Sequence, residues 1–174
     1  MNETVKNIIE RRSVKKYLAK PVEKELIDCV LKAGTYAPTG RNRQPVKILA
    51  ITDPEVREEL RKLNAAVMGM DDGIDPFYGA PVLLVVLADR TASTYLYDGS
   101  LVMGNMMNAA HSLGLGSCWV HRAKEEFETE YGKALLKSLG IEGEWEGIGH
   151  CLLGYADGEL PAAKPRKDGW VHYV

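Results

Sequence analysis

The segment that decides the fold is a long apolar stretch at residues 95–113, which reads YLYDGSLVMGNMMNAAHSL. Its apolar side chains do not keep to one stripe but cover several faces of the predicted helix. A helix of this kind is buried on more than one side. Because a chain of 174 residues has few other elements to wrap it, we expect this helix to be buried against a second copy of the chain. An internal core helix within one chain is the alternative.

Shorter elements are predicted on both sides of this segment. Apolar runs bounded by turn residues predict strands at 46–51, 82–88, 118–121 and 147–155. Helical spacing is found before Arg11, over Glu23–Ala33 with Gly34 after its end, from Asp53-Pro54 onward, and as one helix through 127–139. Residues 68–78 have no clear period, which indicates a loop or a short lid.

The composition bounds the classes of function. The 22 Lys and Arg against 24 Asp and Glu leave a net charge of −2, which disfavours binding to nucleic acid or to an anionic membrane surface. No apolar run approaches the roughly 18 residues that a membrane span requires. Three widely spaced cysteines favour reduced thiols over a disulfide framework. We therefore expect one cytoplasmic domain over residues 1–174, without a secretory leader.

The first candidate for chemistry is Arg11-Arg12-Ser13, followed by Lys15 and Lys16. Guanidinium groups bind phosphate oxygens bidentately, and a serine hydroxyl adds a short donor, so this run is a candidate phosphate clamp. The alternative is a basic end of a helix that favours the helix dipole.

Two further polar segments are candidates. The carboxamides of Asn42 and Gln44 offer donors and acceptors that suit the edge of a flat heterocycle, although a polar turn has the same composition. The run Lys164-Pro165-Arg166-Lys167 could complete an anion site if the fold brings it beside Arg11, and a solvated charge run is the alternative.

Other site classes lack support in the sequence. Cys118 and His121, like the neighbours His150 and Cys151, point to opposite faces of a strand, so we expect no metal site. The glycines at 114 and 116 do not complete a dinucleotide-binding motif, and no nucleophile motif occurs. If the protein is an enzyme, a cofactor carries its reaction, and no catalytic side chain need be named.

Four blocks in their order along the chain resemble the FMN-dependent nitroreductase family. They are residues 11–17 (RRSVKKY), 37–45 (APTGRNRQP), 109–119 (AAHSLGLGSCW), and 153–155 (LGY) with 164–167 (KPRK). The resemblance implies an α+β fold with a central, mostly antiparallel sheet flanked by helices. It further implies an intertwined homodimer with FMN at the interface, the 95–113 helix in the dimer core, and the tail at 170–174 crossing onto the partner.

The resemblance also implies roles for individual residues. Arg11, Arg12, Ser13, Lys164 and Arg166 would hold the phosphate and ribityl side of FMN. Lys15 would reach the pyrimidine edge of the flavin, where a cation stabilises the charge that builds on reduction. Thr39, Gly40, Asn42 and Gln44 would come from the partner subunit and line the ring. Cys118, Trp119 and Val120 would approach the ring near its reactive N5.

The chain departs from the family pattern in two places. Val46 stands where an aromatic residue often follows the Asn-x-Gln-Pro unit, and the segment between Leu63 and Pro81 is short. We expect an open pocket over the flavin, with Phe77 and Tyr78 either contacting the substrate or anchoring the lid.

The implied activity is hydride transfer from NADH or NADPH through flavin N5 to a small electron-poor acceptor such as a nitroaromatic or a quinone. The alternatives are specialised flavin chemistry on the same fold, such as dehalogenation or flavin breakdown, and a redox sensor that binds FMN without turnover.

Overall fold

The computed structural model describes residues 1–174 and is built around one four-stranded sheet. Its strands are β1 (Val46–Ile51), β2 (Val82–Asp89), β3 (Gly116–Val120) and β4 (Trp145–Gly154). Their order is β1-β2-β4-β3, and every neighbouring pair is antiparallel. The long central strands β2 and β4 are buried along nearly their whole length because helices cover both faces of the sheet, and β2 is a near-continuous apolar run.

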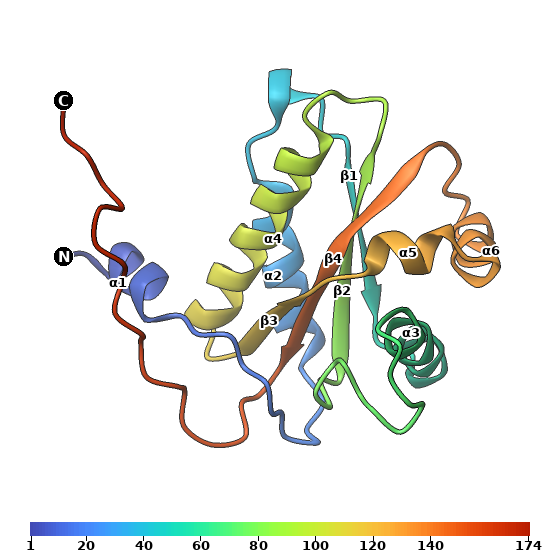
Figure 1. Cartoon of the computed structure of the whole chain (residues 1–174), viewed down its shortest axis with the longest axis horizontal. Helices are drawn as coiled ribbons and strands as arrows, with labels where there is room; N and C mark the ends of the chain where they lie inside the picture. Colours follow the sequence, from blue (N-terminus) through green and yellow to red (C-terminus); the bar gives the residue numbers. More distant parts are fainter.

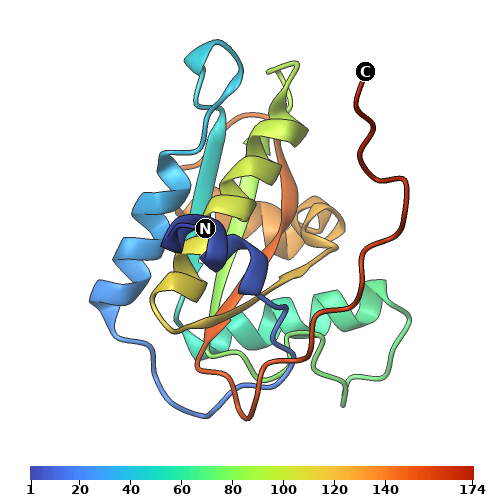
Figure 2. The ribbon, with the colours of Figure 1, turned by 90° about the vertical axis from the view of Figure 1, so that its left-hand side faces the viewer.

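Two layers of helices enclose the sheet (Figures 1 and 2). The layer on one face holds α2 (Lys24–Thr35) and α4 (Tyr95–Ser112), and the layer on the other holds α3 (Pro54–Val67), α5 (Ala123–Glu128) and α6 (Glu130–Ser138). Strand β2 feeds both cores by alternation, since Leu83 and Val85 join one apolar cluster while Leu84 and Val86 join the other. These observations confirm the α+β class.

Most of the predicted elements are confirmed. Strand β1 has the predicted bounds, and α4 ends one residue before the predicted end. Asp53 caps α3 as expected, because its Oδ1 accepts hydrogen bonds from the N–H groups of Glu55 and Val56. Helix α1 (Glu3–Glu10) also forms, but none of its residues is buried, and its apolar side chains Val5, Ile8 and Ile9 remain exposed.

Two details of the predicted helices are wrong. Gly34 does not follow α2 but lies inside it, where an added Cβ would come within 2.8 Å of Met106 Cγ on α4. The helix predicted through 127–139 is two helices, α5 and α6. The helix is interrupted at Thr129. Its Oγ1 donates to Glu126 O and accepts from Gly132 N, so Thr129 caps the second helix.

The segment after α1 extends along the free edge of β3. Ser13 pairs in parallel with Ser117, and Val14 N donates to Ser117 O at 3.0 Å. Tyr17 then pairs with Ala156 beyond the end of β4. This segment carries the residues of the first predicted clamp onto the body of the protein.

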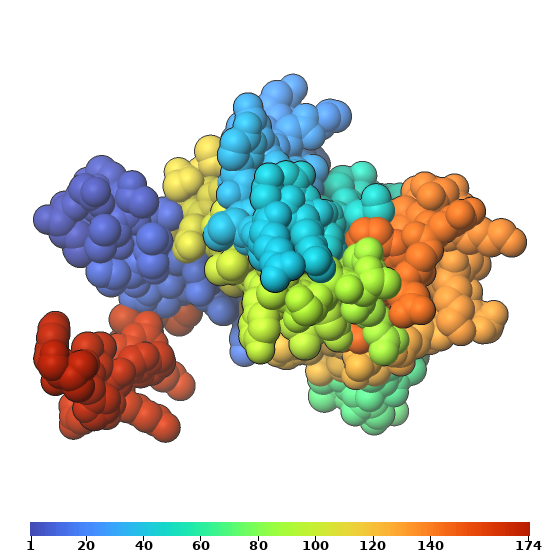
Figure 3. Space-filling view, turned by 90° about the horizontal axis from the view of Figure 1, so that it is seen from above, coloured from blue at the N-terminus to red at the C-terminus, as the bar shows by residue number.

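The C-terminal segment is arranged differently. From residue 158 to the end its residues are exposed, and Figures 2 and 3 show it leading away from the body of the chain. No helix has the length and apolar character needed to cross a membrane.

Candidate functional site

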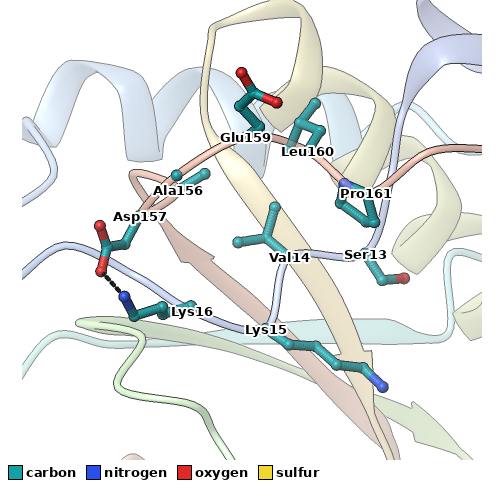
Figure 4. Close-up of a pocket in the computed structure, with 10 residues that line it drawn as sticks. Ser13, Val14, Lys15, Lys16, Ala156, Asp157, Glu159, Leu160 and Pro161 are labelled. Atoms are coloured by element: carbon teal, nitrogen blue, oxygen red, sulfur yellow. Dashed lines mark ion pairs between the residues drawn. The ribbon is translucent and has the colours of Figure 1, made fainter.

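The edge pairing of residues 13–17 brings four of the predicted residues together around β3. Burial raises the pKa of the Cys118 thiol, while a hydrogen bond from Ser13 and the positive charges of Lys15 and Arg11 act in the opposite direction. The Ser13 hydroxyl therefore lies beside this thiol, and the charges of Lys15 and Arg11 are near enough to act on it. In Figure 4, Ser13 and Lys15 point to the same side of the extended segment, as residues i and i+2 of a strand do.

The two arginines of the predicted clamp have different surroundings. Arg12 Nη1 donates to Ile9 O at 2.7 Å and to Arg11 O at 2.8 Å, so this guanidinium group caps the end of α1. Arg11 Nη1 is buried and has no hydrogen-bond partner. A buried donor without an acceptor is costly, and Arg11 has no anionic partner. Arg12 Nε is also buried without a partner, although Arg12 Nη1 is satisfied.

A cavity of about 290 Å³ lies between residues 13–16 and 156–161 (Figure 4). Lys16 joins its two walls through an ion pair of 2.6 Å between Nζ and Asp157 Oδ2. Lys15 takes part in no ion pair; its Nζ lies 5.8 Å from the centre of the Tyr78 ring. The cavity therefore has one cation already neutralised and a second that is free.

The two predicted lid residues point in different directions. Phe77 is fully buried, with its ring 4.9 Å from that of His150. Tyr78 is 39% exposed and lies beside Lys15. The burial of Phe77 supports the anchoring role, because a side chain enclosed by the core is not free to touch a substrate. Tyr78 is placed where a ligand bound next to Lys15 could meet it.

The lid segment is fastened by residues that sequence reasoning missed. Arg57 donates to Ala80 O at 2.7 Å and pairs with Asp75 at 2.7 Å, and Arg61 donates to Asp72 and to Ile74 O. The two arginines are one turn apart on α3, opposite the acidic group at 71–75. That i, i+4 spacing beside a short acidic loop is the signal that could have found this clasp.

The end of β3 presents its residues in alternation. Cys118 and Val120 are buried in the core beneath α3 and α5, so a ligand there would meet mainly their backbone. Trp119 points to the opposite face, against the backbone of Gly149, and its Nε1 is buried without a partner.

The predicted 39–44 loop forms a compact unit. Thr39 Oγ1 accepts from Gln44 N at 3.1 Å, and Gln44 Nε2 donates to Asn42 Oδ1 at 3.0 Å. Gly40 N donates to Asp98 Oδ1 at 2.9 Å, which docks the loop on the first turn of α4. An added Cβ at Gly40 would meet Thr94 Oγ1, so the close approach requires glycine here.

One chain does not bring the predicted residues into one place. The loop docks at the start of α4, while Ser13 pairs with Ser117 just beyond its end (Figure 1). This helix has 18 residues and therefore spans about 27 Å, at about 1.5 Å per residue. Lys164 and Arg166 lie in the exposed C-terminal segment, and no hydrogen bond or ion pair joins them to Arg11.

Comparison with known proteins gives a family match over most of the chain. Residues 8–70 and 74–155 match the model of the Nitroreductase family. The chain is 35% identical over 147 residues to an Archaeoglobus fulgidus protein provisionally named NADH dehydrogenase/NAD(P)H nitroreductase, covering 81% of this chain and 78% of that one. It is 30% identical over 176 residues to the NADPH-flavin oxidoreductase of Vibrio harveyi, covering 95% and 70%.

Solved structures agree with these matches. The crystal structure of a nitroreductase with bound FMN from Bacteroides fragilis superposes with a TM-score of 0.89 at 28% identity, covering all of both chains. Its similarity includes the whole length over which the predicted blocks are distributed.

Proposed function

This chain belongs to the nitroreductase family, and on that premise we propose that it is an FMN-dependent oxidoreductase. It takes electrons from NADH or NADPH and passes them to a small electron-poor acceptor, such as a nitroaromatic or a quinone. The relatives named for flavin and NAD(P)H chemistry and the FMN in the matched structure support this proposal.

The observation that carries the proposal is the buried, unpartnered Nη1 of Arg11. It lies in one cluster with Ser13 and Lys15, and neither Arg11 nor Lys15 has an acidic partner. A phosphate would supply the missing acceptor, and charge-assisted hydrogen bonds to it are strong. The residues present therefore fit the phosphate end of FMN, with Ser13 as a second donor.

The remaining predicted residues would divide the rest of the cofactor. We assign Lys15 to the pyrimidine edge of the flavin, with Tyr78 beside it, and the backbone of Cys118, Trp119 and Val120 to the ring near N5. The phosphate and ribityl side would also draw on Arg12, Lys164 and Arg166. The ring-lining residues Thr39, Gly40, Asn42 and Gln44 would come from the partner subunit.

A homodimer follows from this division. The loop and the cationic cluster lie at opposite ends of α4, so a second chain is needed to bring a loop to each cluster. Large apolar side chains are also exposed on α1, on α4 and in the tail, as expected for surfaces that a partner covers. They are Val5, Ile8, Ile9, Leu96, Tyr97, Leu101, Trp170, Val171, Tyr173 and Val174.

The protein's part in the reaction is positioning and electrostatics. A bound FMN would supply the hydride-transfer chemistry, first with the nicotinamide and then with the second substrate in the same place. The Lys15 ammonium stabilises the negative charge that develops at the pyrimidine edge. Tyr78 bounds the space beside that edge, and the lid clasp keeps it there. Donor and acceptor share one place in turn, so the kinetics should be ping-pong.

A single spectroscopic experiment tests the proposal. Purified protein is incubated with FMN, desalted, and given NADH or NADPH without oxygen. We expect retained flavin absorbance near about 450 nm that bleaches with a nicotinamide. Flavin that is retained but not bleached would indicate a sensor or a specialised reaction instead, and loss of flavin on desalting would contradict the cofactor assignment.

Three thiols without a disulfide are in keeping with a cytoplasmic site of action.

A further inference from the structure

A buried polar network lies behind the end of β3 and is not used by the contacts described so far. We propose that Asn64, Glu126 and His150 form a positioning network that holds the turn at His121–Arg122 in a strained conformation and thereby sets the flavin's surroundings. This inference rests on the proposed function, since it is the flavin that the turn would serve.

The network joins three elements. Asn64 of α3, Glu126 of α5 and His150 of β4 are each fully buried. Asn64 Nδ2 donates to a carboxylate oxygen of Glu126, and His150 Nε2 lies 3.0 Å from the same carboxylate. Its centre is therefore an amide, a carboxylate and an imidazole, all shielded from the protein surface.

The other contacts of Asn64 all reach one turn. Its Nδ2 also donates to His121 O at 3.0 Å, and its Oδ1 accepts from Arg122 Nε at 2.9 Å. Arg122 has φ 79° and ψ 5°, a left-handed conformation that a residue with a Cβ avoids. The network thus grips both the backbone before the strained residue and the side chain of that residue.

Stability alone does not explain this arrangement. Replacing buried polar groups with apolar ones of similar shape is often neutral or stabilising. Here the network leaves His150 Nδ1 buried without a hydrogen-bond partner, and the only polar neighbour of Glu126 Oε2 is His150 Nε2, 3.0 Å away. Strained backbone that the surrounding structure over-determines is concentrated at functional sites. Both the buried polar network and the left-handed turn cost folding free energy. Their combination therefore indicates that the position of the turn is important for function.

The turn is placed where position would matter. It follows directly on Cys118, Trp119 and Val120, the residues assigned to the flavin ring. The His121 ring lies 5.7 Å from the Trp119 ring. A shift of the turn would therefore move His121 relative to Trp119. A fixed turn holds the end of β3 at one distance from the ring, and small displacements near a reacting centre are costly to rate.

The first experiment compares two substitutions on the same face of α3. Asn64→Leu removes the side-chain hydrogen bonds by which the network holds the turn, to His121 O and from Arg122 Nε, and leaves the backbone bond from Glu126 N to Arg122 O. Leu60→Ala, one turn earlier and fully buried, removes core packing but none of the hydrogen bonds to the turn. In FMN-free protein, we expect faster amide hydrogen exchange at residues 121–123 in Asn64→Leu but not in Leu60→Ala.

The FMN-loaded proteins give the second readout. Asn64→Leu should retain FMN, shift its reduction potential and lower its rate of reduction by NAD(P)H by about tenfold, while Leu60→Ala keeps the parent rate. If both variants lose thermal stability alike but keep parent exchange at the turn and the parent rate, the network is purely structural and the proposal is overturned.

A matched pair at Arg122 keeps the proposal testable if Asn64→Leu does not fold. Arg122→Gly and Arg122→Ala both remove the guanidinium group, but only glycine adopts the left-handed conformation freely. We expect Arg122→Gly to keep near-parent exchange and flavin reduction, and Arg122→Ala to resemble Asn64→Leu. Equal behaviour of the pair would overturn the proposal.

A parent protein that binds FMN but is not reduced would contradict the proposed function, while the exchange measurement would still test the network.

Discussion

At the scale of single residues, two neighbouring arginines that the sequence makes equivalent have different tasks. Arg12 Nη1 donates to two carbonyls at the end of α1, although Arg12 Nε is buried without a partner, while Arg11 Nη1 is buried and its guanidinium group makes no hydrogen bond to those carbonyls. We therefore propose one role for each residue, the helix cap for Arg12 and the phosphate contact for Arg11. No sequence pattern could separate them, because the difference depends on which side chain turns back on its own helix.

This difference predicts unequal effects on cofactor binding. Arg11→Ala should weaken FMN binding by about 1.5 to 3 kcal/mol, the range for a lost charge-assisted hydrogen bond, or about tenfold to hundredfold. Arg12→Ala should weaken FMN binding much less and instead loosen α1. Quenching of FMN fluorescence on titration measures both affinities. An Arg11→Ala protein that binds FMN as tightly as the parent would contradict the phosphate assignment.

The cysteines give a second prediction at this scale. Cys29 is exposed, whereas Cys118 and Cys151 are buried. Burial raises the pKa of Cys118 above its ordinary value and that of Cys151 to about 12. Since the thiolate is the reactive form, native protein at pH 8 should show one fast-reacting thiol with a disulfide reagent, and denatured protein should show all three. The variant Cys29→Ser is the control and should show no fast phase.

At the scale of elements, the clasp on the lid segment makes a prediction about pH. Burial by itself would raise the pKa of Asp75, but hydrogen bonds from Arg57 and from the N–H groups of Phe77 and Gly79 hold it below its ordinary value. A carboxyl whose folded pKa is lowered stabilises the fold above its unfolded pKa of about 3.9. That stabilisation is lost as the pH falls through the folded value.

Amide hydrogen exchange at Phe77 and Gly79 measures this loss. At neutral pH both amides should be protected from exchange. After correction for the intrinsic pH dependence of exchange, this protection should fall only below about pH 4. In Asp75→Asn the two amides should be less protected already at neutral pH, with a weaker response to acid. Amides in the middle of β2 serve as the control. If the parent and Asp75→Asn lose protection equally in acid, other carboxyl groups cause the loss.

The elements themselves were largely predictable, and the exceptions have identifiable causes. Strand β1 follows from its apolar run between turn residues, α3 from its apolar period and its Asp53-Pro54 start, and α4 from the length of its apolar stretch. The break at Thr129 was hidden because the apolar stripe continues across it, while Gly132 approaches the backbone of Glu126 too closely for one straight helix. Gly34 was read as a helix end because glycine signals one, although its role is to admit Met106.

At the scale of the whole molecule, the sequence could name the site residues but not their distribution. The order of the blocks along the chain says nothing about which of them meet in space. In the structure, Arg11, Ser13 and Lys15 gather at the edge of β3, while the 39–44 loop lies at the far end of α4. Lys164 and Arg166 remain in an exposed segment. The site of a single chain is therefore half of the predicted one.

Mixed dimers test whether two chains share each site. Arg11→Ala damages the cationic cluster, and Gln44→Ala damages the loop, so either homodimer has two defective sites. If each site takes its cluster from one chain and its loop from the other, the heterodimer has one site with both defects and one site with none. Co-expression with two affinity tags should then restore about half of the parent FMN content per dimer. If each chain built a whole site, every site in the heterodimer would carry one defect, and mixing would restore nothing.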